Sequence, residues 1–364
     1  TVAAGDLNGD GRAEIAASNH LFDAGNSDNW GAVRVWSGRS FQGPATELVA
    51  AYPADFEVIG DNAQDQAHFW VRIAEATGDN LADLVTGSLY DEIPGQTGTT
   101  GILRVFAGRT GALPDTVPTV EIPGPAGGEI FGASAAPLGD LNQDGSVDFF
   151  VYAQGNDGLG PDVGRVRFVS GLDASLIDLD VPGEAMGSRF GNRGAVVPDL
   201  NGDGIEDLVV GAPLNPSENV GRQAGSASIY WGNGSGFSQT PDVILQDFRR
   251  NSAADWFGNA VSTAGDFAGD GRNDLAVVAR FEDRPTSFGA DYVLADTCGG
   301  SSNNSGAVFV FRGQSGGIET HPAFIIYGTI ANDSLIEVAG GLDFNGDGFD
   351  DLVIGNLEFD RTGR

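Results

Sequence analysis

Short apolar runs alternate with acidic, glycine-rich segments along the whole chain, and no segment keeps the 3.6-residue period of an amphipathic helix. The runs at residues 208–210, 275–278 and 352–354 are too short for helices and rich in strand-forming residues. We therefore expect buried β-strands at these places and an all-β architecture.

Two further segments recur with strand character. The first alternates with period two between glycines, and its copies are GAVRVWSG from residue 31, GILRVFAG from 101, GRVRFVSG from 164, GSASIYWG from 225 and GAVFVFRG from 306. The second is an aromatic-glycine pair or a similar pair, and its copies are His68-Phe69, Phe131-Gly132, Phe190-Gly191 and Phe257-Gly258. Together with the apolar runs they predict three strands in each repeating unit.

An acidic nine-residue loop precedes each apolar run and occurs six times. The copies are DLNGDGRAE (6–14), EATGDNLAD (75–83), DLNQDGSVD (140–148), DLNGDGIED (199–207), DFAGDGRND (266–274) and DFNGDGFDD (343–351). Their starts lie 59 to 77 residues apart, which leaves room for a fourth strand per unit. This length and strand content indicate four-stranded β-propeller blades rather than leucine-rich or helical repeats. We expect one propeller domain over residues 1–364, with incomplete first and last blades.

Composition limits the partners of such a domain. The formal charge is -32, from 51 acidic and 19 basic residues, which opposes binding to nucleic acids and favours cations. No apolar stretch is long enough for a transmembrane segment. The single cysteine, Cys298, permits no intrachain disulfide and no thiolate zinc site.

The acidic loops have the spacing of a metal site. Oxygen-bearing side chains at positions 1, 3, 5 and 9, with a backbone carbonyl at position 7, can surround a hard cation, and glycine at position 6 permits the turn. The complete sets are Asp6, Asn8, Asp10, Arg12 and Glu14; Asp140, Asn142, Asp144, Ser146 and Asp148; Asp199, Asn201, Asp203, Ile205 and Asp207; and Asp343, Asn345, Asp347, Phe349 and Asp351. The weaker sets are Glu75, Thr77, Asp79, Leu81 and Asp83, with Asn80 at position 6, and Asp266, Asp270, Arg272 and Asp274, with Ala268 at position 3.

Calcium suits these loops better than magnesium or zinc, because the ligands are many, flexible and all oxygen. An EF-hand loop would have twelve residues between helices, whereas here a strand follows position 9 directly. A single copy would fit an ordinary acidic turn; six copies in one register indicate about four to six bound calcium ions. We expect the metal to be structural rather than a switch, with lower affinity at the second and fifth loops.

Phe190-Gly191, the segment DLNGDGIEDLVVGAP at 199–213 and GSASIYWG at 225–232 together resemble one FG-GAP blade of an integrin α-subunit head. The other copies match less fully, but the repeat covers essentially the whole chain. The resemblance implies calcium loops on one face, ligand contacts through loops of the other face, and a secreted or cell-surface protein similar to bacterial or archaeal members. Such propellers usually have seven blades. The sequence fits either a piece of a longer chain or a chain whose missing strands a neighbour donates.

No catalytic motif is recognisable, because His20, His68 and His321 lie far apart and the carboxylates belong mostly to the loops. We expect a non-catalytic extracellular module that binds a protein or glycan through its loop face. The inserts at 18–31 and 281–306, with Phe22, Trp30, Phe288 and Tyr292, are candidates for that contact. The alternatives are a subunit of a homo-oligomer or filament, completed by strand donation, and an accessory propeller of a secreted lyase or phospholipase.

Overall fold

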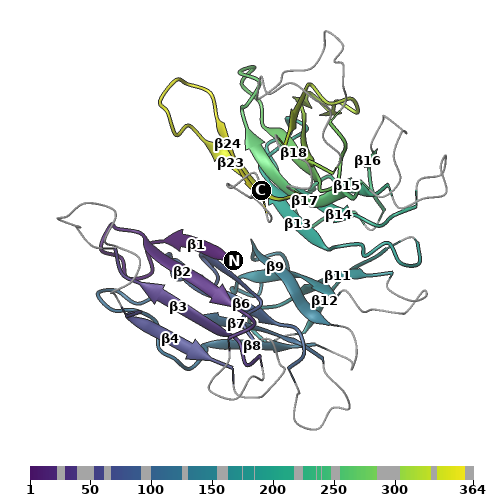
Figure 1. The fold of residues 1–364 in the computed structure, drawn as a ribbon. Helices are drawn as coiled ribbons and strands as arrows, with labels where there is room; N and C mark the ends of the chain where they lie inside the picture. The colour runs from purple at the N-terminus through teal and green to yellow at the C-terminus, as the bar shows by residue number, and fades with distance from the viewer. Residues whose placement is uncertain are drawn as a thin grey trace. The chain divides into compact units, whose positions relative to one another are not determined.

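The fold consists of strands joined by turns and loops. The computed structural model describes residues 1–22, 29–38, 53–60, 67–91, 100–124, 130–153, 163–173, 175–183, 185–216, 224–234, 236–238, 240–246, 255–284, 304–328 and 334–356. Within these ranges every regular element is a β-strand (Figure 1), which confirms the all-β prediction.

Among the described residues, five sheets have four strands each, and we number them in chain order. Sheet 1 contains β1 (Val2–Gly5), β2 (Glu14–Asn19), β3 (Ala32–Trp36) and β4 (Phe56–Ile59); sheet 2 contains β5 (Trp70–Ala74), β6 (Asp83–Ser88), β7 (Ile102–Phe106) and β8 (Val120–Pro123). Sheet 3 contains β9 (Phe131–Gly139), β10 (Asp148–Ala153), β11 (Arg165–Val169) and β12 (Leu176–Pro182); sheet 4 contains β13 (Arg193–Val197), β14 (Asp207–Ala212), β15 (Ser226–Tyr230) and β16 (Val243–Gln246). Sheet 5 contains β17 (Phe257–Gly265), β18 (Asp274–Ala279), β19 (Ala307–Phe311) and β22 (Phe324–Tyr327), and the small hairpin of β20 (Gly313–Gln314) and β21 (Gly317–Ile318) lies between its last two strands. The last sheet pairs β23 (Leu335–Leu342) with β24 (Asp351–Asn356).

Burial explains the sequence pattern within each sheet. Every residue of β6, β10, β14 and β18 is buried, so these second strands are apolar without alternation. The outer strands β4, β8 and β16 mix buried with exposed positions, and they alternate as a half-solvated strand should. The four-stranded antiparallel sheets have the strand number and strand order expected of propeller blades.

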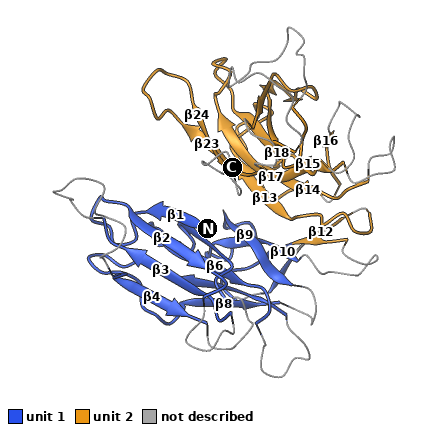
Figure 2. Cartoon of the chain, viewed as in Figure 1, with its two compact units in different colours: residues 1–156, 167–178 blue, residues 157–166, 179–364 orange. Residues whose placement is uncertain are grey.

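The chain divides into two compact units, residues 1–156 with 167–178 and residues 157–166 with 179–364 (Figure 2). In the first unit, side chains of sheets 1 and 2 form one apolar cluster that includes Leu84 and Phe106, and a second cluster includes Phe131 and Phe149. In the second unit, sheets 4 and 5 share a cluster that includes Phe257 and Phe309. Apolar sheet faces therefore pack against neighbouring sheets within each unit.

Backbone atoms also join consecutive sheets. The glycine before the third strand has a positive φ, for example 87° at Gly225, and a Cβ there would lie 2.1 Å from the carbonyl oxygen of Phe257 in the next sheet. Phe257 N–H donates a hydrogen bond to the Ala224 carbonyl at 3.0 Å. The same pairing recurs between Gly31 and Ala67, Gly101 and Phe131, and Gly164 and Phe190. We call this pairing the glycine joint.

The joint corrects the predicted register in sheet 2. Ala67 N–H donates to the Trp30 carbonyl at 3.2 Å, as Phe131 N–H donates to Thr100, so Ala67-His68 and not His68-Phe69 takes the aromatic-glycine place. His68 adopts the positive φ (55°) that glycine has elsewhere, lies fully buried, and has Nδ1 2.9 Å from the Thr86 hydroxyl. Burial lowers the pKa of His68 to about 3, so the ring is neutral at pH 7.

The predicted burial of the three apolar runs is confirmed for two of them. Residues 208–210 and 275–278 are buried as expected, but the prediction for 352–354 is wrong, because Val353 is 55% exposed. That strand, β24, pairs with β23, and no other described strand pairs with it.

Phe288, Tyr292 and Cys298 of the second insert lie outside the described residues, as does part of the first insert. No helix among the described residues has the length and apolar character needed to cross a bilayer.

Candidate metal centres

Each acidic loop connects the first and second strands of a sheet, so all six occupy equivalent places in the repeat. Their turns need left-handed backbone at positions 4 and 6, and in the fourth loop Gly202 and Gly204 have φ of 80° and 86°. In the second loop Asn80 takes φ 68° at position 6, and in the third loop Gln143 takes φ 60° at position 4. Asparagine tolerates this conformation, so the missing glycine of the second loop leaves the turn in place.

The position-1 carboxylate organises the turn from inside. In the fourth loop, Asp199 Oδ1 accepts the Asp203 N–H at 2.8 Å, and Asp199 Oδ2 accepts the Gly204 N–H at 2.9 Å. Equivalent bonds occur in loops 1, 3, 5 and 6. Hydrogen bonds to the ionised form, led by the Gly11 N–H in loop 1 and the Gly348 N–H in loop 6, lower the pKa of Asp6 and of Asp343. These carboxylates are therefore anionic at neutral pH.

Positions 3 and 5 follow the same pattern. In the fourth loop, Asn201 Oδ1 accepts the Asp203 N–H at 2.9 Å, and Asp203 Oδ1 accepts the Ile205 N–H at 2.8 Å. Each of these oxygens keeps lone pairs beyond the backbone bond, because a carboxylate or amide oxygen can accept more than one partner. In the third loop the Ser170 hydroxyl also donates to Asp144 and lowers the pKa of that carboxyl.

Position 9 holds the loop to its own blade. Asp207 is fully buried, and its Oδ2 accepts the Leu200 N–H at 2.8 Å while its Oδ1 accepts the Gly232 N–H at 3.0 Å beyond the third strand. Glu14, Asp83 and Asp274 bond in the same way to the glycines after their third strands. Burial raises the pKa of Asp207, and it raises that of Asp274 to about 6. The sequence pattern marked position 9 only as a ligand, whereas the structure also gives it this anchoring task.

Two buried carboxylate oxygens in the loops have no hydrogen-bond partner among the described residues: Oε2 of Glu75 and Oδ1 of Asp148. A buried acceptor without a donor is costly, since it has lost its water without replacement. A cation would supply the missing partner, so both atoms fit a metal site. Glu75 belongs to the loop that the sequence marked as weak.

The structure brings the predicted ligands of each loop into one short turn, but it does not gather every carboxylate around one point. Within the described ranges, no three His, Cys, Asp or Glu side chains form a group suited to a metal ion. Each predicted donor set contains three carboxylates, at positions 1, 5 and 9, and the described structure does not bring these three together at one point. The all-oxygen donors fit a hard cation. Calcium at these loops stays a prediction.

Neighbouring loops touch within each unit. A Cβ on the position-4 glycine of one loop would meet the position-7 side chain of the next: Gly9 faces Leu81 at 3.4 Å, and Gly202 faces Arg272 at 3.5 Å. Gly269 similarly faces Phe349 at 2.1 Å. Glycine at position 4 of loops 1, 4 and 5 therefore lets each of these loops pack against the next loop, a requirement that a single loop sequence does not reveal.

A second cluster lies at the end of sheet 5 away from its acidic loop, where β17 begins and β18 ends. The rings of Trp256 and Phe281 meet edge to face with centroids 4.9 Å apart. The Arg280 guanidinium carbon lies 4.8 Å from the Phe281 centroid and 5.6 Å from that of Trp256. Trp256 has φ 57°, and Ile130, Arg189 and Ser334 at the equivalent places have φ of 50–52°, so this conformation belongs to the repeat. We call Trp256, Arg280 and Phe281 the aromatic-arginine cluster.

The family comparisons agree with the repeat. The model of the FG-GAP-like repeat matches residues 193–277, which include the fourth and fifth loops. The model of the FG-GAP repeat matches residues 1–36 and 336–364, which include the first and sixth loops.

Several curated relatives are integrin α subunits. Integrin alpha-5 of Xenopus laevis is 30% identical over 241 residues, which are 64% of this chain and 20% of the relative. Integrin alpha-6 of Gallus gallus is 33% identical over 180 residues, and integrin alpha-IIb of Homo sapiens 30% over 179; each match covers 48% of this chain, and 14% and 15% of the relative. The matched part is thus a fifth or less of each relative.

Among solved structures, the Bacillus licheniformis rhamnogalacturonan lyase PL11 aligns over 98% of this chain and 72% of its own, with 13% identity. Its TM-score of 0.37 is too low to support an argument. The repeated loops, the antiparallel sheets and the sequence matches agree on one identification. This chain carries FG-GAP repeats similar to those of integrin α subunits.

Proposed function

We propose that the chain is an extracellular, non-catalytic recognition module, in which calcium stabilises the acidic loops and a partner protein binds at the opposite ends of the blades. The observation that carries the proposal is the aromatic-arginine cluster. Arg280 has no ion-pair partner within the described part of the chain, and its Nε has no hydrogen bond. Tryptophan, phenylalanine and arginine are typical of binding hot spots.

The two ends of the blades differ, and this difference supports the proposal. The loop end repeats one set of backbone hydrogen bonds in blade after blade, which indicates a structural task. The connection between the second and third strands is much longer in sheet 5, at 280–306, than in the other four-stranded sheets, as expected for a surface that contacts a partner. We therefore assign the partner contact to this connection and the metal to the acidic loops.

Surface plasmon resonance against a panel of purified extracellular-matrix proteins tests the recognition role. We expect at least one panel protein to bind the wild-type chain, and Arg280→Gln to weaken that binding at least tenfold. Arg34→Gln is the matched control, because Arg34 also lies over a ring, that of Phe22 at 4.5 Å, but is already paired with Glu57. Equal effects of the two substitutions, or no binding by any panel protein, would contradict the proposal.

Thermal melting tests the calcium part separately. Binding to the folded state alone raises the midpoint, by about 2.7 kcal/mol of stability when the free ion is at a hundred times its Kd. Calcium should therefore raise the midpoint and a chelator should lower it. A midpoint indifferent to both would refute calcium binding without touching the recognition test.

A further inference from the structure

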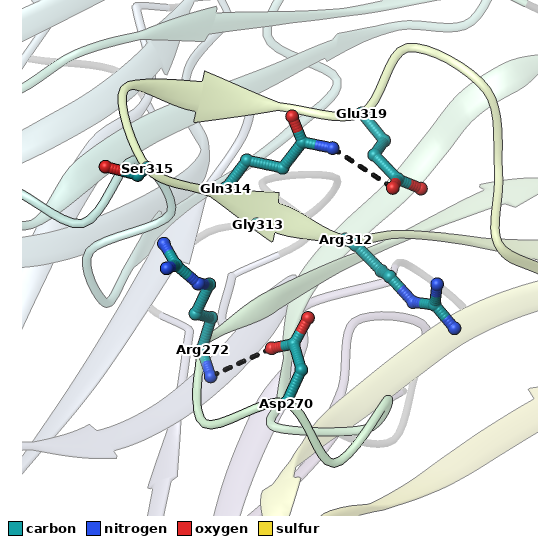
Figure 3. Close-up of a pocket in the computed structure, with 7 residues that line it drawn as sticks. All are labelled: Asp270, Arg272, Arg312, Gly313, Gln314, Ser315 and Glu319. Atoms are coloured by element: carbon teal, nitrogen blue, oxygen red, sulfur yellow. Dashed lines mark hydrogen bonds between the residues drawn. The ribbon is translucent and has the colours of Figure 1, made fainter.

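A polar pocket of about 270 Å³ lies at the loop end of sheet 5 (Figure 3). Asp270 and Arg272 of the fifth loop form one wall, and Arg312, Gln314, Ser315 and Glu319 around the β20–β21 hairpin form the other. An adjoining cavity of about 290 Å³ shares Asp270 and Arg272 and reaches Asp199 and Gly202 of the fourth loop. All of these residues belong to the second unit.

The walls of the pocket are held in place by backbone contacts. Gly316 N–H donates to the Asn201 carbonyl of the fourth loop at 2.6 Å, and Gly313 N–H donates to Asp274 Oδ1 at 3.2 Å. A Cβ on Gly313 would lie 2.2 Å from the Asn273 carbonyl oxygen, so the hairpin sits directly on the loop backbone. The pocket is therefore formed before any ligand arrives, which reduces the entropy cost of binding.

Two arginines supply an unused positive charge in a strongly acidic chain. Neither Arg272 nor Arg312 has an ion-pair partner in the described ranges. The Arg312 guanidinium lies 5.4 Å from the Phe324 ring centroid, and its shielded Nε has no hydrogen bond. Figure 3 shows the two guanidinium groups extending on either side of Asp270, beneath the hairpin. An arginine fork is well suited to a carboxylate.

The rest of the lining accepts hydrogen bonds. Gln314 Nε2 donates to Glu319 Oε1 at 3.0 Å, which fixes both side chains and leaves the second Glu319 oxygen and the Gln314 carbonyl as acceptors. A simple anion such as sulfate would meet these acceptors and Asp270 unfavourably. A neutral sugar would leave both guanidinium groups unpaired. The lining thus suits a ligand that bears a carboxylate together with several hydroxyl groups.

We propose that this pocket binds one hexuronate unit of an acidic polysaccharide, with the carboxylate accepting from Arg312, a sugar oxygen accepting from Arg272, and sugar hydroxyls donating to Glu319 and Gln314. The volume of about 270 Å³ is large enough for a single pyranose ring. This role goes beyond the proposed protein recognition, and it uses the other end of the blade.

Isothermal titration with tri-galacturonate, in calcium and in chelator, tests the proposal. We expect saturable binding that Arg312→Gln and Arg272→Gln each weaken at least tenfold. Arg109→Gln is the matched control, because Arg109 lies at the related hairpin of sheet 2 but is paired with Asp115. Circular dichroism and melting confirm that each variant is folded, and Arg312→Gln remains informative if the loop variant is not.

Three outcomes would overturn the proposal: tri-galacturonate binding that both arginine substitutions leave unchanged, equal binding of neutral galactose oligomers, or binding of an acidic peptide but not of the uronate. Sodium sulfate competing as strongly as the uronate would also count against it. The protein panel assay is independent, since Arg312→Gln should leave binding through Arg280 intact. A failure here therefore refutes the pocket without refuting the recognition role.

Discussion

The glycine joint between sheets 4 and 5 can be tested by replacing Gly225 with alanine. The new Cβ would lie 2.1 Å from the Phe257 carbonyl oxygen, at least 1 Å closer than ordinary contact, and the backbone has φ 87°. Relieving the contact requires movement of Phe257, which is fully buried and packs edge to face on Phe309 at 5.3 Å. It also endangers the 3.0 Å hydrogen bond from Phe257 N–H to Ala224.

The magnitude follows from comparison with Gly234→Ala in the same sheet. Gly234 has φ 77°, but a Cβ added there would meet nothing within 4 Å, so alanine costs only the left-handed backbone, about 1–2 kcal/mol. Gly225→Ala should cost about 2–4 kcal/mol more, from the lost hydrogen bond and the disturbed phenylalanine packing. This difference is large against the stability of a typical domain.

Urea unfolding followed by circular dichroism, in chelator, measures the difference between the two variants from their midpoints and a common slope. The chelator removes any contribution from bound metal. If Gly225→Ala lowers the free energy of unfolding no more than Gly234→Ala does, the joint does not hold the sheets as we describe, and the repeated close approach is without energetic consequence.

Three further substitutions address single groups. Asp207→Asn should lower the free energy of unfolding by about 1–3 kcal/mol in chelator, because the amide would face the N–H of Leu200 or of Gly232; a melting midpoint equal to wild type would contradict this. The pKa of His68 falls from 6.5 to about 3 on folding, so stability should be complete above pH 6.5 and fall by up to about 1.4 kcal/mol per pH unit below it. His68→Asn, which tolerates the positive φ, should remove that part of the slope in urea titrations from pH 7 to 4. Glu75→Gln should remove one calcium ion from the stoichiometry measured by isothermal titration, and an unchanged stoichiometry would show that the second loop binds none.

The sequence was sufficient to predict three strands of each unit and the loops, because these repeat in one register, whereas it left only room for fourth strands such as β16. Alternation in GSASIYWG predicted β15, and the apolar residues 208–210 predicted the buried strand β14. The register of Ala67-His68 could not be predicted, since it depends on a hydrogen bond to Trp30 in the preceding sheet. The prediction that residues 352–354 are buried was wrong for a related reason: burial depends on what packs beside a strand and not only on the strand's own residues.

The candidate sites divide in the same way. Positions 1 to 7 of each loop are local, and the sequence predicted their turn and the glycine at position 6, but not the left-handed backbone at position 4. The second bond of Asp207 reaches Gly232, 25 residues away, and the pocket joins Arg272 to Arg312 across two strands. Such contacts form only when the sheet is assembled, so a local sequence motif does not predict them. Trp256 and Arg280 likewise meet because β17 and β18 are neighbours.

The glycine joint has a consequence for how such proteins evolve. Its contacts are a carbonyl oxygen, an N–H and a missing side chain, so the backbone part of the docking is the same from blade to blade. A duplicated blade therefore brings matched backbone contacts with it, and only the apolar side chains of the shared clusters have to fit anew. Side chains that point to solvent can then change, while the backbone contacts between sheets stay the same.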